Sequence, residues 1–481
     1  MIVVIINEYS VFQVIFLYGQ VDIWDIVTLD VTCEYYGYCS THFWGALSMI
    51  ETETVKTGVK NGNKLVINGK KKLSGSVKIS GAKNAVLKLM AASLLSNSQC
   101  LIRNVPRIRD VETMFGVLNG LGAETTWEDE SSILIRVDRG LGYSAPDELV
   151  KEMRASVQVM GPLLAKLGRV KLFQPGGCII GQRPIDLHLK GFQALGAEVI
   201  EEHGYVYVQA KKLRGAEIHL DFPSVGATEN IKAAAILAEG TTVIRNAAKE
   251  PEIIEEQNFY NRLGARIRGA GTDTIRIEGV SELNNRYIDY TVIPDRIEAG
   301  TFMIAAAVTK GDILLTDVIP EHVDALASKI REIGVSIETD AETIRIKTEG
   351  PLKAADVTVL PYPGFPTDLQ PQITSLLSIA GGTSVITENV FGSRFRYVDE
   401  LIRMGASIKV ESRSAIVKGV KSLSGASVYA PDLRAGAALV IAGLAAEGET
   451  SIEGIQYLDR GYVAVEEKLA GLGAEIRRIS F

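Results

Sequence analysis

Cysteine and histidine are scarce in this chain of 481 residues, which holds four cysteines and five histidines. The cysteines, Cys33, Cys39, Cys100 and Cys178, form no C-x-x-C pair, and no Cys/His pair has the spacing of zinc ligands. The sequence therefore predicts neither a disulfide framework nor a metal site. A reducing cytoplasm is the simplest compartment for such a chain.

Positive charge is not in excess, because 51 Lys and Arg stand against 58 Asp and Glu. A net charge of −7 argues against a nucleic-acid binder, which is usually basic or carries a basic stripe. The hydrophobic share of 46% and the charged share of 23% are typical of a soluble globular protein. The length is sufficient for two or more domains, each with its own core.

The N-terminal stretch differs from the rest. Residues 1–55 contain no Lys or Arg, and residues 1–48 contain ten of the 32 aromatics and no proline. Without a positively charged start it is no secretory signal, and Glu8, Asp22 and Asp25 interrupt the apolar run before about 20 residues accumulate for a membrane helix. We expect residues 1–62 to be an atypical extension, either disordered or translated from a start assigned upstream of the true one. The alternative is an extension that docks on a membrane or a partner.

From Lys64 onward the chain repeats itself with a period of about 70 residues. An apolar residue followed by Gly recurs at Gly122, Gly196, Gly264, Gly334, Gly405 and Gly473, at spacings of 74, 68, 70, 71 and 68 residues. Gly suits the end of a helix because the capping residue takes a positive φ at little cost. Each repeat alternates helices with short strands, which predicts six α/β or α+β modules. A period this long favours closed groups over an open solenoid, so we expect three modules in each of two domains.

Cys178 lies in a loop, because residues 174–184 hold three glycines and two prolines around it. The thiol is carried on flexible backbone, and Arg183 can place a positive charge beside it. A buried structural thiol is the alternative reading.

Several charged residues lie in apolar or glycine-rich surroundings where a fold gains nothing from them. Arginine binds phosphate and carboxylate through its planar fork and keeps its charge, and a lysine at a helix start attracts anions. Such a set indicates a substrate with more than one anionic group, although each member alone could be an ordinary ion pair. The set comprises Lys83, Arg154, Arg183, Asp368, Arg394, Arg434 and Arg460.

Residues 64–481 resemble the UDP-N-acetylglucosamine 1-carboxyvinyltransferase family, the UDP-GlcNAc enolpyruvyl transferases. The resemblance rests on several motifs in the same order over more than 400 residues. These are residues 81–85 (Gly-Ala-Lys-Asn-Ala), 153–156 (Met-Arg-Ala-Ser), 177–188 around Cys178, 224–228 (Ser-Val-Gly-Ala-Thr), 365–368 (Phe-Pro-Thr-Asp), 394–395 (Arg-Phe) and 432–435 (Asp-Leu-Arg-Ala).

The resemblance implies an inverted α/β prism, in which each of two domains is built from three βαβαββ repeats. Domain I would comprise residues 63–83 and 293–481, and domain II residues 84–292 with the cysteine loop. This agrees with the six modules found in the repeats. Substrate binding should then close the cleft between the domains.

The resemblance also implies transfer of the enolpyruvyl group of phosphoenolpyruvate to the 3′-hydroxyl of UDP-GlcNAc, the first committed step of peptidoglycan synthesis. Cys178 would be the general acid, the site of a pyruvate adduct and the target of fosfomycin, and Asp368 the general base. Lys83, Arg183 and Arg460 would neutralise the phosphate and carboxylate of the donor. Arg434 would be a further carboxylate contact, and Arg154 and Arg394 would line the same cleft.

By the same resemblance, UDP-GlcNAc would be held by Asn84, Pro184, Ile185, Asp186, Leu187, Ser224, Val225, Gly226 and Val390. One position departs from some relatives of this type: Phe222 stands where they have a lysine, so no charged nucleotide contact is expected there. No cofactor, metal, nucleic acid or membrane partner is implied.

Two other functions remain open at this point. One is 5-enolpyruvylshikimate-3-phosphate (EPSP) synthase, which shares the fold and the donor, although the chain has no Asn-Ala-Gly-Thr-Ala-type phosphate loop. The other is a catalytically silent paralogue that binds UDP-GlcNAc as a regulator. Loss of Cys178 or Asp368 would favour the latter, and both are present.

Overall fold

The computed structural model describes residues 2–8, 11–18, 25–31, 63–137, 140–174, 184–284 and 286–480. The chain divides into two compact units, Met1–Lys60 and Asn61–Phe481. The first unit holds an antiparallel sheet of β1 (Ile2–Glu8), β2 (Val11–Tyr18) and β3 (Asp25–Val31), in the order β1-β2-β3. The expectation that residues 1–62 are an atypical extension stays a prediction.

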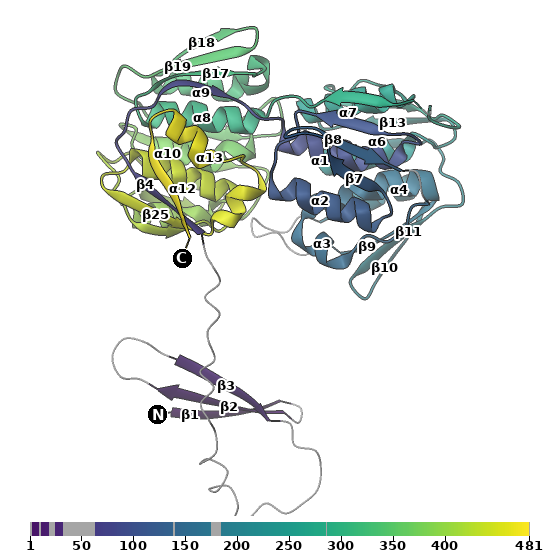
Figure 1. The fold of residues 1–481 in the computed structure, drawn as a ribbon, viewed down its shortest axis with the longest axis horizontal. Helices are drawn as coiled ribbons and strands as arrows, with labels where there is room; N and C mark the ends of the chain where they lie inside the picture. Colours follow the sequence, from purple (N-terminus) through teal and green to yellow (C-terminus); the bar gives the residue numbers. More distant parts are fainter. Residues whose placement is uncertain are drawn as a thin grey trace, which may run out of the picture. The chain divides into compact units, whose positions relative to one another are not determined.

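The described residues of the second unit form six sheets, which surround two cores of buried apolar side chains. Core 1 runs from Ala82 to Val292, and core 2 joins Leu65–Ile79 to Ile297–Ala474. Three sheets enclose each core (Figure 1). The assignment of the two cores to two domains with the boundaries given above stays a prediction.

Core 1 is enclosed by the sheets β16-β6-β8-β7, β10-β11-β9 and β12-β13-β15-β14. Their strands are β6 (Cys100–Arg103), β7 (Glu124–Trp127), β8 (Ile133–Arg136), β9 (Arg169–Phe173), β10 (Glu198–Glu202), β11 (Tyr205–Gln209), β12 (Glu217–His219), β13 (Thr241–Arg245), β14 (Arg266–Arg268), β15 (Thr274–Glu278) and β16 (Ile288–Thr291). Their helices are α1 (Lys83–Ala92), α2 (Arg109–Gly120), α3 (Asp147–Glu152), α4 (Met160–Leu167), α5 (Asp186–Ala194), α6 (Val225–Ala235) and α7 (Pro251–Arg262), with the 3-10 turns η2 (Ser93–Leu95) and η3 (Arg154–Val159).

Core 2 is enclosed by the sheets β18-β19-β17-β5, β20-β21-β23-β22 and β24-β25-β4-β26. Their strands are β4 (Asn63–Asn68), β5 (Ser74–Lys78), β17 (Asp312–Thr316), β18 (Ser336–Asp340), β19 (Thr343–Lys347), β20 (Val357–Val359), β21 (Thr383–Glu388), β22 (Ser407–Glu411), β23 (Ser414–Lys418), β24 (Ser427–Tyr429), β25 (Glu449–Glu453) and β26 (Glu475–Ser480). Their helices are α8 (Arg296–Val308), α9 (Asp324–Ile333), α10 (Gln370–Leu377), α11 (Val398–Arg403), α12 (Leu433–Ala445) and α13 (Val465–Gly471), with η4 (Pro320–Val323), η5 (Thr367–Leu369), η6 (Arg394–Tyr397) and η7 (Ile455–Arg460).

The predicted βαβαββ repeat is confirmed. In one repeat β12 leads through α6 to the parallel strand β13, and α7 then leads to β14 and β15, which pair antiparallel. The first helices α8 and α12 are buried on nearly all sides, whereas the second helix α9 is amphipathic. The last sheet is completed by β4 from the start of the unit, which pairs with both β25 and β26.

The recurring glycines end the second helix of every repeat. Gly122, Gly196, Gly264, Gly334, Gly405 and Gly473 follow α2, α5, α7, α9, α11 and α13, and their φ angles lie between 91° and 104°. A side chain at such a φ would clash with the adjacent backbone, so glycine lets each helix turn directly into the next strand.

The first strands of two repeats are exchanged between the cores. Strand β5 pairs with β17 around core 2 but leads into α1 of core 1, whereas β16 pairs with β6 around core 1 but leads into α8 of core 2. The two links meet where Ala82 N donates to Ile293 O at 2.8 Å and Asp295 N donates to Ser80 O at 2.8 Å. Helices α1 and α8 therefore both begin at this crossing.

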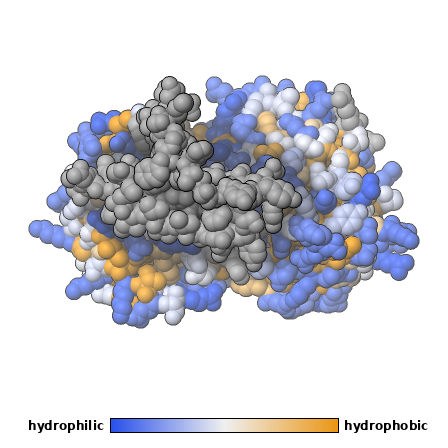
Figure 2. Space-filling view, turned by 90° about the horizontal axis from the view of Figure 1, so that it is seen from below, coloured by the Kyte–Doolittle hydropathy of each residue, from blue (hydrophilic) through white to orange (hydrophobic). Residues whose placement is uncertain are grey.

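On the face shown in Figure 2, hydrophilic residues predominate and hydrophobic ones form small separate patches. Isolated apolar side chains on a surface are normal for a globular protein. In the part of the chain that the structure describes, no helix has both the length and the apolar character needed to cross a membrane.

The glycines with positive φ allow the helix ends of the repeats to be tested by substitution. Gly334→Ala is expected to destabilise the protein by about 1–2 kcal/mol, because Ala adopts a positive φ only at a steric cost. Gly350→Ala is the matched control, since its added Cβ would meet no atom within 4 Å and its backbone is not left-handed. Urea unfolding should show a lower midpoint for Gly334→Ala only. Equal midpoints for the two variants would contradict the left-handed helix end at Gly334.

Candidate functional site

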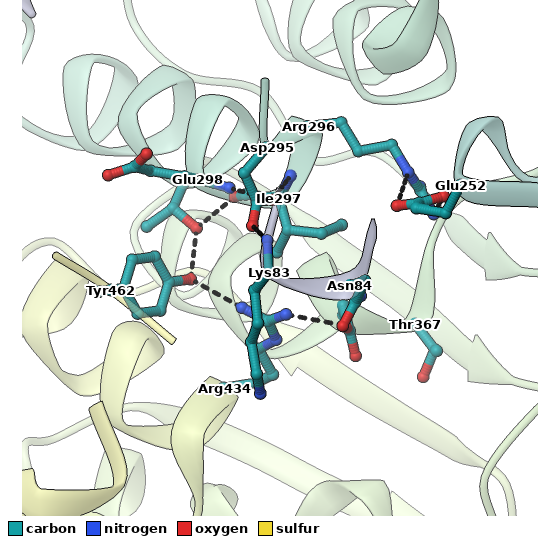
Figure 3. A network of polar contacts seen from close by, with 12 residues as sticks. Lys83, Asn84, Glu252, Asp295, Arg296, Ile297, Glu298, Thr367, Arg434 and Tyr462 are labelled. Atoms are coloured by element: carbon teal, nitrogen blue, oxygen red, sulfur yellow. Dashed lines mark hydrogen bonds and ion pairs between the residues drawn. The ribbon is translucent and has the colours of Figure 1, made fainter. Parts of the chain in front are cut away.

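Lys83 and Asn84 are the first two residues of α1, at the crossing of the two links. The buried carboxylate of Asp295 fixes this start. Its Oδ1 accepts from Ile297 N at 2.7 Å and Glu298 N at 3.1 Å, which caps α8, while its Oδ2 accepts from Lys83 N at 3.1 Å. One side chain therefore holds the first turns of two helices from different cores, as Figure 3 shows.

Lys83 is joined to Arg460 through a buried carboxylate, Asp110, in the first turn of α2. Lys83 Nζ lies 2.8 Å from Asp110 Oδ2, and Arg460 Nε donates to Asp110 Oδ1 at 2.8 Å. Arg460 ends η7, which packs on core 2, whereas Asp110 and Lys83 belong to core 1 segments. The group of Lys83, Asp110 and Arg460 is called the first triad below.

Burial and charge act against one another in the first triad. Burial lowers the pKa of Lys83, and the nearby Arg434 and Arg460 add to that, while Asp110 opposes it; the net pKa is lowered. Burial alone would raise the pKa of Asp110, but the charges of Lys83 and Arg460 outweigh it, so this pKa is lowered and the carboxylate is ionised.

A second carboxylate, Asp368 in η5, also bridges two cations. Arg394 Nη2 donates to Asp368 Oδ1 at 3.0 Å, and Arg434 Nη2 donates to Asp368 Oδ2 at 2.9 Å. Asn84 Nδ2 donates to the same Oδ2 at 3.4 Å. Arg394 and Arg434 are both buried, 2% and 5% exposed, whereas the Asp368 side chain keeps 26% of its surface. The second triad thus consists of Arg394, Asp368 and Arg434.

The two triads adjoin. Lys83 and Arg434 lie next to each other (Figure 3), and Arg434 contributes to the lowered pKa of Lys83. Asn84 connects α1 to Asp368. Tyr462 holds Arg434 in place, because its hydroxyl accepts from Arg434 Nη1 at 3.4 Å and shares a 2.8 Å hydrogen bond with the Thr301 hydroxyl. Each triad contains one more positive than negative charge, which suits a ligand with two anionic groups.

The remaining predicted residues lie in core 1 segments and in the loop after β21. Arg154 begins η3 and donates from Nη2 to Pro184 O at 3.4 Å, so these two predicted residues touch. Ile185 precedes α5, which begins with Asp186 and Leu187. Ser224 caps α6 by accepting from Ala227 N at 3.3 Å, and Val225 and Gly226 form the first turn of that helix. Val390 N donates to Glu388 Oε1 at 2.7 Å.

Cys178 and Arg183 lie outside the described residues. The structure therefore brings together Lys83, Asn84, Asp368, Arg394, Arg434 and Arg460 from the predicted set. Among the described residues, no group of three or more His, Cys, Asp or Glu side chains is arranged to hold a metal ion.

Sequence reasoning missed Asp110, Asp295 and Tyr462. Asp110 was detectable in principle, because it stands among apolar residues on the buried side of an amphipathic helix, where an unpaired acid would be costly. Asp295 precedes a long Ala-rich helix and fits the pattern of an N-cap. Nothing in the sequence around Tyr462 distinguishes it from a core aromatic.

The fold and the site define a class of proteins. The solved structure of the enolpyruvyl transferase NikO from Streptomyces tendae matches with a TM-score of 0.79 and 25% sequence identity, over 88% of this chain and all of NikO. The family model described as EPSP synthase (3-phosphoshikimate 1-carboxyvinyltransferase) matches residues 67–469. The fold is that of the enolpyruvyl transferases, the inverted α/β prism.

Curated relatives narrow the class. A protein of Caldanaerobacter subterraneus subsp. tengcongensis named UDP-N-acetylglucosamine 1-carboxyvinyltransferase 1 is 56% identical over 415 residues, which are 86% of this chain and 99% of the relative. A protein of the same name from Symbiobacterium thermophilum is 53% identical over 426 residues, 88% of this chain and 96% of the relative. The chain belongs to the EPSP synthase family and, within it, to the UDP-N-acetylglucosamine 1-carboxyvinyltransferases.

The second triad predicts an unusual response to paired substitutions. Asp368→Asn should destabilise the protein, because two buried guanidiniums then lie together without their shared anion. Adding Arg394→Met should recover part of the loss, since one repelling charge is removed. A coupling on the order of 1–2 kcal/mol is expected in a double-mutant cycle measured by urea unfolding. Losses that simply add would contradict the shared-anion arrangement.

Proposed function

We propose that this protein transfers the enolpyruvyl group of phosphoenolpyruvate to the 3′-hydroxyl of UDP-GlcNAc and releases phosphate, in bacterial peptidoglycan synthesis. The observation that carries the proposal is the pair of adjoining triads, which place four cations around two carboxylates. A donor with a phosphate and a carboxylate matches this charge. The names of the relatives support UDP-GlcNAc as the acceptor.

The chemistry requires an acid and a base on opposite partners. The enol carbon C2 is a poor electrophile until C3 is protonated, and a sugar hydroxyl is a weak nucleophile until its proton is removed. In the addition, C3 gains a proton, the 3′-oxygen bonds to C2 and the hydroxyl proton leaves. In the elimination, the C2–O bond to phosphate breaks, C3 loses a proton, and the double bond forms again. We assign the acid to Cys178 and the base to Asp368.

The surroundings of Asp368 fit this assignment. Its side chain retains 26% exposure although its partners Arg394 and Arg434 are buried, so the side chain is accessible to a substrate. The two guanidiniums orient the carboxylate, and Asn84 links it to the start of α1. In the proposal a sugar hydroxyl takes up a position beside this carboxylate, held by backbone and side chains of residues 184–187, 224–226 and 390.

The first triad is assigned to the donor. Lys83 and Arg460 would contact its phosphate and carboxylate together with Arg183, and Arg434 would be a further carboxylate contact. Fixed cations stabilise the negative charge that the phosphate gains as its bond to C2 breaks, without a reorganisation cost at the moment of reaction. Arg154 would line the same cleft.

We further propose how the two cores correspond to domains and where the protein is located. We assign core 1, apart from Ala82 and Lys83 just before the boundary, to a domain of residues 84–292, which carries the Cys178 loop. Core 2 is assigned to a domain of residues 63–83 and 293–481. The first triad already links the two through Asp110 and Arg460, and closure around the substrates would bring the Cys178 loop to it and complete the site. A cytoplasmic location would match the substrates.

Turnover tests the proposal directly. Phosphate release should require phosphoenolpyruvate and UDP-GlcNAc together, and Cys178→Ala should reduce it by about 10²-fold or more, the usual contribution of a general acid. The same assay with shikimate 3-phosphate as acceptor is the control for the related reaction. Release with shikimate 3-phosphate alone would refute the proposed acceptor. Binding of UDP-GlcNAc without any turnover would favour a silent regulator.

A further inference from the structure

Asp110 is a buried carboxylate in apolar surroundings, and packing of the core does not require its charge. Its side chain is only 4% exposed, and its neighbours along α2 include the fully buried Val111 and Met114. A carboxylate in such a place is costly unless it is paired. Its partners are the two cations of the first triad, so the reason for its position has to be sought in them.

Asp110 divides its two oxygens between these cations. Oδ2 lies 2.8 Å from Lys83 Nζ, Oδ1 accepts from Arg460 Nε at 2.8 Å, and Arg460 Nη2 reaches Oδ2 at 3.5 Å. Lys83 passes close to the backbone just after Arg460, where a Cβ added to Gly461 would lie 3.2 Å from Lys83 Cδ. The two cations are therefore held side by side although their segments belong to different cores.

The charges that face Lys83 explain what the carboxylate does. Arg434 of α12 and Arg460 of η7 both act to lower the pKa of Lys83, as does its burial, and Asp110 of α2 acts in the opposite direction. Asp295, at the start of α8, touches Lys83 through the backbone N–H. Without Asp110, a buried ammonium would be left beside two guanidiniums, and it would lose its proton at a lower pH.

We propose that Asp110 is a positioning residue, which keeps Lys83 protonated and aligned with Arg460 so that both cations meet the anionic donor together. The inference rests on the proposed function, in which these two cations contact phosphoenolpyruvate. Asp110 acts through them and does not itself touch the donor. Through these contacts Asp110 joins segments of the two cores at the donor site.

Asp110→Asn tests the proposal in the full-length protein. The KM for phosphoenolpyruvate should rise at least tenfold, while the KM for UDP-GlcNAc should change less than threefold. The alkaline limb of the kcat/KM profile for phosphoenolpyruvate should move to lower pH, because Lys83 would lose its proton more easily. A role limited to stability would move neither the ratio of the two KM values nor the pH limb.

Glu256→Gln is the matched control. Its carboxylate is also 4% exposed and also lies 2.8 Å from a lysine, Lys232, but both residues lie within core 1 segments and outside the triads. It should lower thermal stability while leaving both KM values and the pH limb unchanged.

Asp110→Glu separates charge from position and provides the test if Asp110→Asn does not fold. It should raise the KM for phosphoenolpyruvate severalfold but leave the alkaline limb in place, because the charge is kept and its position is shifted. A wild-type KM for phosphoenolpyruvate in either folded variant would overturn the inference. So would equal increases in the KM for both substrates. If the wild-type protein itself shows no turnover with both substrates, the proposed function fails instead.

Discussion

The crossing of two chain links, held by the Asp295 carboxylate, is the constraint on which the site depends. Strands β5 and β16 each pair in one core and lead into a helix of the other, so α1 and α8 must start at the same place. Asp295 satisfies backbone donors at both starts. Because Lys83 and Asn84 open α1, their side chains are delivered to a point where residues from both cores meet.

Around that point, positive and negative side chains depend on one another, so that loss of either leaves the other without its partner. Two carboxylate-centred triads hold four cations close together, and each carboxylate prevents the repulsion that its two cations would otherwise exert. The same arrangement leaves a positive excess, which a doubly anionic donor can neutralise. The same contacts thus contribute to the stability of the fold and to binding of the donor. A substitution in either triad is therefore expected to change both stability and donor binding.

The number of repeats and most of the charged site residues could be predicted from the sequence. The recurring apolar-Gly step gave six repeats because a left-handed helix end is a local property of the chain. Lys83, Asp368, Arg394 and Arg434 stood out because their surroundings are apolar or glycine-rich. The bridging role of Asp110 was not accessible, since Arg460 is 350 residues away and the pairing depends on the exchanged strands. Periodicity counts the repeats, but it cannot show that two of them exchange their first strands.

The first triad, with contacts that join both cores, is proposed to hold the anionic groups of the donor. A crystal structure of the Cys178→Ala variant with phosphoenolpyruvate and UDP-GlcNAc tests it most directly. Donor phosphate or carboxylate oxygens are expected at about 3 Å from Lys83 Nζ and from the Arg460 guanidinium, with Asp110 still bound to Lys83. A donor bound elsewhere, with neither cation in contact with it, would contradict the account.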